Sequence, residues 1–331
     1  MPQTIRPATP EDIPKLVELL LLDAAERQAK DSVLWRMADD APVQIEKALE
    51  FALTSGQQPV RQIWQVALHA GQITGVIHAM LLPVPPIYAG AKGAPGLILP
   101  DSFAASDAPD GTVGALIDAA ENALEDAGAQ IILSSFVTGK AWHDAFQQRG
   151  YAPLTLYLSR SDLGKQAMPA DIRPATDADI AGIVAQSAVN RQVLCHIDAF
   201  WDIHPQADAR FAAWMTRSLT LRDRDMLVMG APETLEGYVI AQPASRLHFP
   251  PAHDISCTGV IDDYYHPDLA DPETLANTGA DVATLLRAAE AAFADRGLKA
   301  AFVVCPAGWR SKIELLEAGG YKTAMVWSIK R

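Results

Sequence analysis

Residues Ile5–Ile13 read IRPATPEDI, and residues Ile172–Ile180 read IRPATDADI. The two stretches begin 167 residues apart (172 − 5), which is close to half of the 331-residue chain. In each, a short extended Ile-Arg-Pro precedes a threonine, Thr9 or Thr176, with an aspartate three residues later. A threonine followed at that spacing by an acidic residue is typical of a helix N-terminal capping box. The sequence therefore predicts that one strand–helix unit occurs twice.

The similarity continues through the rest of both halves. WQVALHAGQITGVIHAML and MLVMGAPETLEGYVIAQP each predict two strands around a turn. Further on, each half has an alanine-rich helix ended by a glycine, Gly128 or Gly297, then a strand, a helix, a Gly-Tyr pair and a last strand. The predicted unit is strand, helix, helix, three strands, helix, strand, helix, strand. We expect two α/β domains, residues 1–162 and 168–331, joined by a turn-rich segment near Ser161–Asp171.

Composition limits the partners and the compartment. The hydrophobic fraction of 49% and the charged fraction of 20% are ordinary for a globular protein. A net charge of −13 disfavours nucleic acid and anionic membrane surfaces as partners. The three cysteines are widely spaced and form no CxxC pair, which argues against a disulfide framework and a thiolate metal site. No signal segment and no run of about 18 apolar residues is present, so we expect a cytoplasmic protein that neither spans nor binds a membrane.

The order of elements, the capped IRPAT opening, the hairpin and the closing Gly-Tyr strand resemble the GNAT acetyltransferase superfamily, once per half. The resemblance implies an α+β fold in which each half is a twisted, mainly antiparallel mixed sheet flanked by helices. It also implies acetyl-CoA as acyl donor, held where the fourth and fifth strands splay apart, with its pyrophosphate on the N-terminus of the next helix. The usual acceptor is an amine, so the expected partner is a small-molecule amine.

The loop before that helix differs between the halves. Backbone N–H groups at a helix start favour a di-anion, and glycine allows its close approach. In the first half Gly111 matches the family's first required glycine, although Ala108 replaces its basic residue. The candidate pyrophosphate contacts there are Gly111, Thr112, Val113 and Gly114. An ordinary helix start, with glycine serving only the turn, is the alternative for both halves.

In the second half the matching loop offers Gly279, Ala280 and Ala283 as cofactor contacts, but Asp281 stands where a glycine is expected. We expect the Asp281 carboxylate to cap the helix itself and so to compete with a pyrophosphate. An insertion at Ala270–Asn277 precedes this loop. The first half is therefore the better candidate for CoA.

Candidate proton-transfer residues lie around the fourth strand of each half. The resemblance implies an acid tyrosine shortly before the closing Gly-Tyr, but those positions are Phe146 and Leu316. For a base, Asp101 and Asp263 occupy equivalent strand positions, and His266 is a third candidate with a side chain that titrates near neutral pH. Asp262 should face away from Asp263, because strand side chains alternate. Each could instead be a strand or turn residue without a catalytic role.

Two functions therefore remain open. The first is a tandem N-acetyltransferase that transfers acetyl from acetyl-CoA to a small-molecule amine, with one half degenerate. The alternative is a non-catalytic GNAT-fold module that binds a ligand or regulates a partner, since both loops and both acid positions deviate. A dimerisation scaffold is a weaker third. No metal is expected, and the sequence does not predict the oligomeric state.

Overall fold

A computed structural model describes residues 3–85, 87–137 and 140–331. The first half contains β1 (Thr4–Pro7), η1 (Pro10–Asp12), α1 (Ile13–Lys30), α2 (Ala41–Thr54), β2 (Gln62–His69), β3 (Gln72–Leu81), β4 (Pro95–Ile98), β5 (Phe103–Ala104), α3 (Thr112–Asp126), β6 (Ile131–Phe136), α4 (Lys140–Gln148) and β7 (Tyr151–Arg160). The two-residue β5 continues the path of β4 beyond an interruption.

The second half contains β8 (Ile172–Pro174), η2 (Asp177–Asp179), α5 (Ile180–Ile197), η3 (Ala199–Trp201), α6 (Ala207–Ser218), β9 (Asp225–Ala231), β10 (Thr234–Pro243), β11 (Thr258–Tyr265), η4 (Pro267–Leu269), η5 (Ala276–Gly279), α7 (Ala280–Asp295), β12 (Ala300–Pro306), α8 (Arg310–Ala318) and β13 (Lys322–Lys330). Apart from the short 3-10 turns and β5, the order of elements in both halves is the predicted one.

Both predicted capping boxes are present at the two opening corners. The backbone N–H of Thr9 donates to Asp12 Oδ2 at 2.8 Å, and that of Thr176 donates to Asp179 Oδ2 at 2.8 Å. In each half the arginine of the IRPAT motif, Arg6 or Arg173, also donates two hydrogen bonds to this aspartate, at 2.6–2.8 Å. The repeated motif thus fixes the angle between the first strand and the first helix twice.

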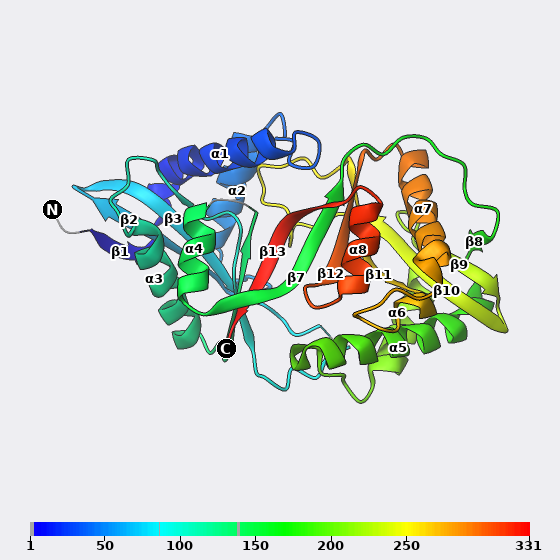
Figure 1. Ribbon diagram of the computed structural model, residues 1–331. Coiled ribbons are helices and arrows are strands. Elements are labelled where there is room, and N and C mark those ends of the chain that lie inside the picture. Colours follow the sequence, from blue (N-terminus) through cyan, green and yellow to red (C-terminus); the bar gives the residue numbers. More distant parts are fainter. Residues whose placement is uncertain (1–2, 86, 138–139) are drawn as a thin grey trace.

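The strands form one sheet that runs through both halves. In the described residues the order is β1-β2-β3-β4-β6-β13-β7-β12-β11-β10-β9-β8, with β5 beside β3. The last strand of each half therefore lies between two strands of the other half: β7 lies between β13 and β12, and β13 lies between β6 and β7, at the centre of Figure 1. Only β4 with β6 and β11 with β12 are parallel pairs, so the predicted mixed, mainly antiparallel sheet is confirmed. The predicted domain limits, 1–162 and 168–331, stay a prediction.

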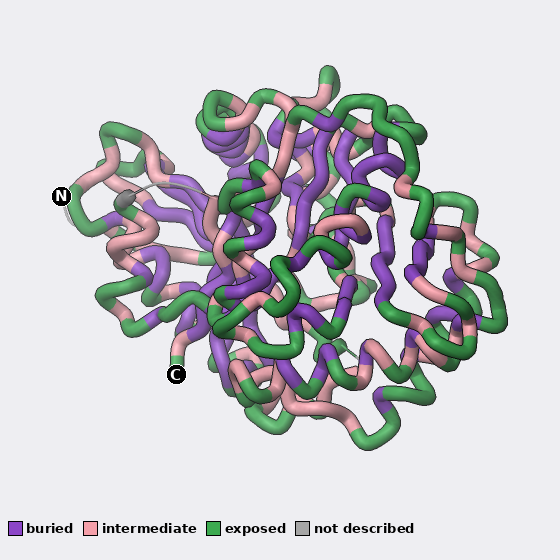
Figure 2. The backbone as a smooth tube through the Cα atoms, turned by 45° about the vertical axis from the view of Figure 1, so that its right-hand side comes forward, coloured by how far each residue is buried: buried purple, intermediate pink, exposed green. Residues whose placement is uncertain are grey.

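Helices cover both faces of the sheet. Trp64, Val66 and Val76 point from β2 and β3 toward α1 and α2, whereas their neighbours Ala67 and Ile77 point toward α3 and α4. Figure 2 shows the buried strands inside a shell of more exposed helices and loops. Among the described residues, no helix combines the length and apolar character needed to cross a membrane.

The connections between the third and fourth strands cross over to the other half. Ala89 N donates to Asp202 O at 2.8 Å, which ties the first half's connection to the segment after η3. In return, Ala38 N donates to Ala252 O at 2.9 Å, and Asp254 N donates to Arg36 O at 2.8 Å. The second half therefore covers the segment between α1 and α2 in the first.

Candidate active site

An irregularity in the fourth strand places an aspartate at the same position in each half. In the first half, four residues (99–102) face two residues of β3, because Ile98 pairs with Ala79 and Phe103 pairs with Val76. In the second half, the pairing shifts by one residue beside Asp263. The residue after the hairpin glycine is Val76 in the first half, where it pairs with Phe103. It is Tyr238 in the second half, where it pairs with Tyr265. Asp101 and Asp263, each two residues before these partners, are therefore equivalent, as the sequence predicted.

Asp101 is buried and held by a histidine. Its carboxylate oxygens lie 2.9 and 3.0 Å from His78 Nδ1, and the imidazole stacks on Trp64 with ring centroids 3.8 Å apart. Burial acts to raise the pKa of Asp101, but His78 and Arg27 outweigh it, so that the pKa is lowered. Asp101 lines a void of about 10 Å³, room for one water at most, beneath Pro250, Pro251 and Ala252 of the second half. Its predicted role as a base stays a prediction.

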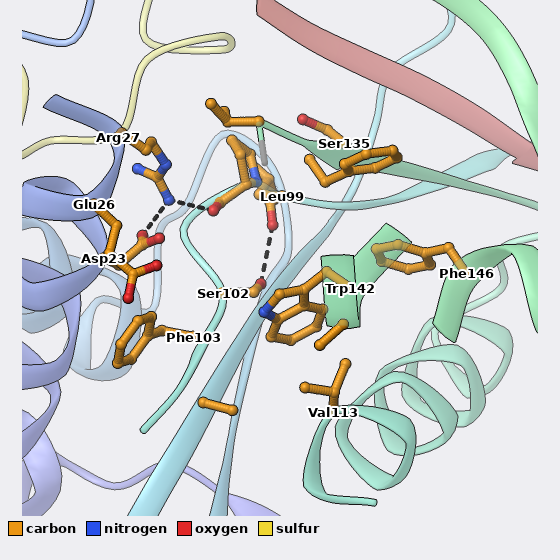
Figure 3. A pocket seen from close by; sticks show the side chains of 15 residues that line it. Asp23, Glu26, Arg27, Leu99, Ser102, Phe103, Val113, Ser135, Trp142 and Phe146 are labelled. Atoms are coloured by element: carbon orange, nitrogen blue, oxygen red, sulfur yellow. Dashed lines mark hydrogen bonds and ion pairs between the residues drawn. The ribbon is translucent and has the colours of Figure 1, made fainter. Parts of the chain in front are cut away.

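A buried ion pair on α1 separates this void from a larger cavity. Arg27 donates to the Asp23 carboxylate and to the Pro100 carbonyl (Figure 3). It also lies 3.3 Å from His253 Nε2, and His253 Nδ1 lies 2.9 Å from the Trp35 carbonyl. Burial, with the nearby Arg27 charge, lowers the pKa of His253 to about 3, so this histidine is neutral. Burial raises the pKa of Asp23 to about 7, even though Arg27 acts to lower it.

The larger cavity lies at the carboxyl ends of β4 and β6. Its volume is about 210 Å³. Asp23 and Glu26 line it from α1, and Trp142 and Phe146 line it from α4 on the other side (Figure 3). The cavity exists because β4 stops at Ile98, where the chain leaves the parallel register with β6. One wall therefore carries two carboxyl groups together with the Arg27 that pairs with Asp23, and the opposite wall is aromatic.

A groove joins this cavity to the start of α3. The groove has a volume of about 690 Å³ and contains all four predicted pyrophosphate contacts, Gly111, Thr112, Val113 and Gly114. Gly111 has a φ of +85°, and nothing lies within 4 Å of a Cβ built on it, so the approach to the helix start is open. The groove shares three lining residues with the cavity, and they are Ala104, Val113 and Ala141.

The groove also holds a basic residue that the sequence analysis missed. Arg149, just after α4, donates from Nη2 to Gly114 O at 3.0 Å and from Nε to Asp118 at 2.7 Å. It stands beside the helix start, where Ala108 provides no charge. Asp110 and Asp144 line the same groove, and their negative charges repel an anionic ligand. No motif in the loop indicates Arg149, because its position depends on how α4 packs on α3.

The corresponding helix start in the second half is covered by its own chain. A Cβ built on Gly279 would lie 2.5 Å from Leu275 Cδ2 and 2.8 Å from Leu315 Cδ1. Leu275 belongs to the predicted insertion, Ala270–Asn277, which runs from the end of η4 into η5 and folds over the loop. The predicted cofactor contacts Gly279, Ala280 and Ala283 thus lie beside this insertion, and the packing on Gly279 does not support that role.

Asp281 behaves differently from the sequence prediction. Among the described residues no hydrogen bond joins its carboxylate to the helix start, where Gly279 is the N-cap, so the capping prediction is wrong. Its carboxylate instead lies within 4.8 Å of ligand atoms of His266 and Asp268. The physical reason is the packing of η4 against the start of α7, which places His266 and Asp268 beside this carboxylate.

Large side chains fill the gap between β11 and β12. Tyr264 is the equivalent of Ser102, because each follows the equivalent aspartate. Lys312 is the equivalent of Trp142, because each lies eight residues before the closing Gly-Tyr. Lys312 Nζ donates to Tyr264 O at 3.2 Å and lies 3.8 Å from the centre of the Tyr264 ring. Burial lowers the pKa of this lysine.

Asp263 and His266 belong to separate networks. Tyr238 Oη donates to Asp263 Oδ1 at 2.6 Å, Asn190 Nδ2 donates to it at 3.0 Å, and burial raises the pKa of Asp263 despite both contacts. His266 Nδ1 instead accepts from Asp268 N at 3.2 Å. Asp262 is exposed and accepts a hydrogen bond from Gln242 of β10. That Asp262 faces away from Asp263 stays a prediction, because the pairing shifts by one residue at this point and strand alternation is interrupted. A shared catalytic role for Asp263 and His266 stays a prediction.

Comparison with solved structures identifies the fold. A GCN5-related N-acetyltransferase from Sphaerobacter thermophilus is similar over 99% of this chain and 95% of that one, with a TM-score of 0.55 and 13% identity. A tandem GNAT protein from the clavulanic acid biosynthesis pathway is similar over 99% and 97%, with a TM-score of 0.52 and 14% identity. No protein-family model and no curated protein matches the sequence. At these identities the likeness shows the fold, which is that of the GNAT acetyltransferases in tandem form.

Proposed function

We propose that the chain is an acetyl-CoA-dependent N-acetyltransferase whose first half carries out the transfer to a small-molecule amine. The observation that carries this proposal is the continuous path in the first half from the open start of α3 to the cavity between β4 and β6. In the second half, Leu275 and Leu315 pack on Gly279, and Tyr264 and Lys312 pack between the equivalent strands. The second half is the degenerate one.

The residues around α3 fit a CoA pyrophosphate. The first N–H groups of a helix have no partner within the helix, and here Gly111 leaves their approach open. Arg149 adds a positive charge beside Gly114, while Asp118 accepts a hydrogen bond from it. Acetyl-CoA would supply the acetyl group as a thioester that reaches the cavity through the passage lined by Val113 and Ala141.

The acidic wall of the cavity fits a cationic amine and provides a base. Asp23 has a pKa of about 7, raised by burial, so at neutral pH it can accept a proton and can also hold one. In the transfer, the cationic amine first loses one proton to solvent and becomes a neutral nucleophile. Asp23 then takes the second proton from the amine nitrogen as this nitrogen forms the bond to the acetyl carbon and the carbon–sulfur bond breaks. The sulfur leaves as a thiolate and takes a proton from solvent, because Phe146 offers none.

Calorimetric titration with acetyl-CoA tests which helix start holds the pyrophosphate. Gly111→Asp places a carboxylate at the start of α3, and we expect it to weaken binding at least tenfold, or ~1.4 kcal/mol. Gly111→Asn is the matched control, because asparagine tolerates a positive φ as well as aspartate does but carries no charge. Ala280→Asp makes the same charge change at an exposed residue in the first turn of α7, next to the covered Gly279, and we expect unchanged affinity. Weaker binding by Ala280→Asp alone would move the site to the second half.

Thiol release during incubation with a panel of primary amines separates this function from its alternative. The non-catalytic reading is favoured by Phe146 and Ala108, which replace the acid and the basic residue implied by the resemblance. Acetyl-CoA binding without thiol release from any amine would support a ligand-binding module instead.

A further inference from the structure

The two ends of the insertion in the second half bring together three side chains that ligate metals. His266 and Asp268 come from η4 and its N-cap, and Asp281 comes from the first turn of α7. One ligand atom of each lies within 4.8 Å of the other two. His266 and Asp268 are 7% and 3% exposed, and Asp281 is exposed to solvent. The cluster has no equivalent motif in the first half, where this insertion is missing.

One atom of this cluster lacks a partner although it is buried. Asp268 Oδ1 accepts a hydrogen bond from Asn277 Nδ2 at 2.9 Å, whereas Oδ2 has no hydrogen-bond partner among the described residues. A buried carboxylate oxygen without a donor is costly, because it has lost water and gained nothing in exchange. Oδ2 lies 3.5 Å from His266 Nδ1, the nitrogen that accepts from Asp268 N at 3.2 Å and therefore carries no proton. A neutral imidazole is the form that binds metals.

We propose that His266, Asp268 and Asp281 bind a divalent transition-metal ion, with zinc as the best fit. Zinc bonds to nitrogen and oxygen ligands are about 2.0–2.2 Å long, so two ligands at the tetrahedral angle lie about 3.4 Å apart. The 3.5 Å between His266 Nδ1 and Asp268 Oδ2 matches this spacing. Coordination replaces the long hydrogen bond to His266, and Asn277 keeps the Asp268 carboxylate oriented, as outer-shell partners of metal ligands do.

The charges and ligand types agree with this choice. The two aspartates carry two negative charges, which balance those of a divalent ion. They also offset the repulsion between the ion and the partial positive charge at the N-terminus of α7. An imidazole ligand argues against calcium and magnesium, which prefer oxygen atoms. The ion would join η4 to the start of α7 and hold the insertion over Gly279. The proposal does not depend on acetyl transfer, since it concerns the face that the second half closes.

Zinc titration of the chelator-stripped full chain tests the proposal, with bound metal measured by elemental analysis. We expect one zinc per chain. His266→Asn keeps an acceptor for Asp268 N, and Asp281→Asn changes only an exposed residue, so both variants should fold. We expect each to weaken zinc binding at least tenfold.

Asp295→Asn is the matched control, because it removes the same charge at the exposed far end of α7 and should bind zinc as the wild type does. Co²⁺ gives a second readout, since a four-coordinate site produces visible absorption that His266→Asn should abolish. The proposal is wrong if the wild type takes up no zinc, if His266→Asn retains it, or if Asp281→Asn and Asp295→Asn bind equally.

Discussion

The two halves have the same order of helices and main strands and an aspartate at the equivalent strand position, yet the cavity and the groove found at a helix start in the described residues belong to the first half. Two substitutions between equivalent positions account for much of the difference in the cavity. In the first half, Ser102 leaves space beside the interrupted β4, and Trp142 lines the cavity. In the second half, the larger Tyr264 replaces Ser102, and Lys312, the equivalent of Trp142, lies on the Tyr264 ring. The comparison teaches that the space beside the fourth strand can be filled in one copy of this fold, while the sheet and the capping boxes stay intact.

The second half, whose gap is filled, still contributes residues to the cavity region of the first half. Pro250, Pro251 and Ala252 of the second half close the void above Asp101, and His253 contacts the Arg27 that holds Asp23. The last strands are also exchanged, since β7 of the first half lies between β13 and β12, and β13 of the second half lies between β6 and β7. The second half is therefore part of the first half's site, and it cannot be removed without exposing that site.

The largest expected difference between the halves comes from replacing the proposed base, Asp23. We expect Asp23→Asn to lower turnover by about 10²–10⁴-fold, because it removes a positioned base but keeps an acceptor for Arg27. Asp263→Asn makes the same chemical change in the second half and should leave turnover within about twofold, well below the effect of losing a positioned base. Steady-state rates of thiol release measure both. If Asp263→Asn is the more damaging change, the second half is catalytic and the comparison is reversed.

The pH profile gives the next largest effect. Because burial raises the pKa of Asp23 to about 7, this carboxyl is protonated below that pH and cannot accept the amine proton. We expect turnover to rise about tenfold per pH unit below 7 and to level off above it, as expected for a single base.

Stability should respond to the same group in the opposite direction. The native carboxyl keeps its proton between about 4 and about 7 while the unfolded one loses it, so stability falls as the pH rises through that window. Thermal unfolding of the wild type and of Asp23→Asn at both ends of the window measures this, since the variant lacks the titrating group. A wild type that shows the same pH dependence as Asp23→Asn would contradict the assigned pKa.

Much of the fold follows from the sequence, because capping boxes, hairpins and glycine-ended helices depend on local residues. The equivalence of Asp101 and Asp263 was predictable for the same reason, since it needs only the strand register. Asp23, Arg149 and His253 were not predictable. They reach the site through helix packing and through a loop from the other half, and contacts between segments far apart in sequence leave no local pattern.

A bulky side chain at the junction of cavity and groove tests whether they form one path. Ala141 lies exposed in the first turn of α4 and lines both spaces. We expect Ala141→Phe to weaken acetyl-CoA binding about tenfold, a change of ~1.4 kcal/mol. Ala280→Phe adds the same group at the exposed start of α7 and should leave the affinity unchanged in the same titration. Equal affinities for Ala141→Phe and the wild type would show that the ligand does not use this path.

The smallest effect concerns the filled gap itself. The Tyr264 hydroxyl is buried without a hydrogen-bond partner among the described residues, so it has lost its hydration without compensation. Tyr264→Phe removes that hydroxyl and keeps the ring on which Lys312 lies, and we expect it to raise the free energy of unfolding by about 1 kcal/mol. Tyr321→Phe is the control with the opposite sign. Its hydroxyl donates to Glu290 at 2.8 Å, so its removal should cost about 1–3 kcal/mol.

Urea unfolding of both variants measures these changes in the free energy of unfolding. A rise for Tyr264→Phe and a fall for Tyr321→Phe mean that the gap between β11 and β12 is a dry, packed core with no room for a thioester. If Tyr264→Phe lowers stability as Tyr321→Phe does, its hydroxyl is hydrated in solution. The gap in the second half would then be open to water, and the distinction between an open half and a filled half would no longer hold.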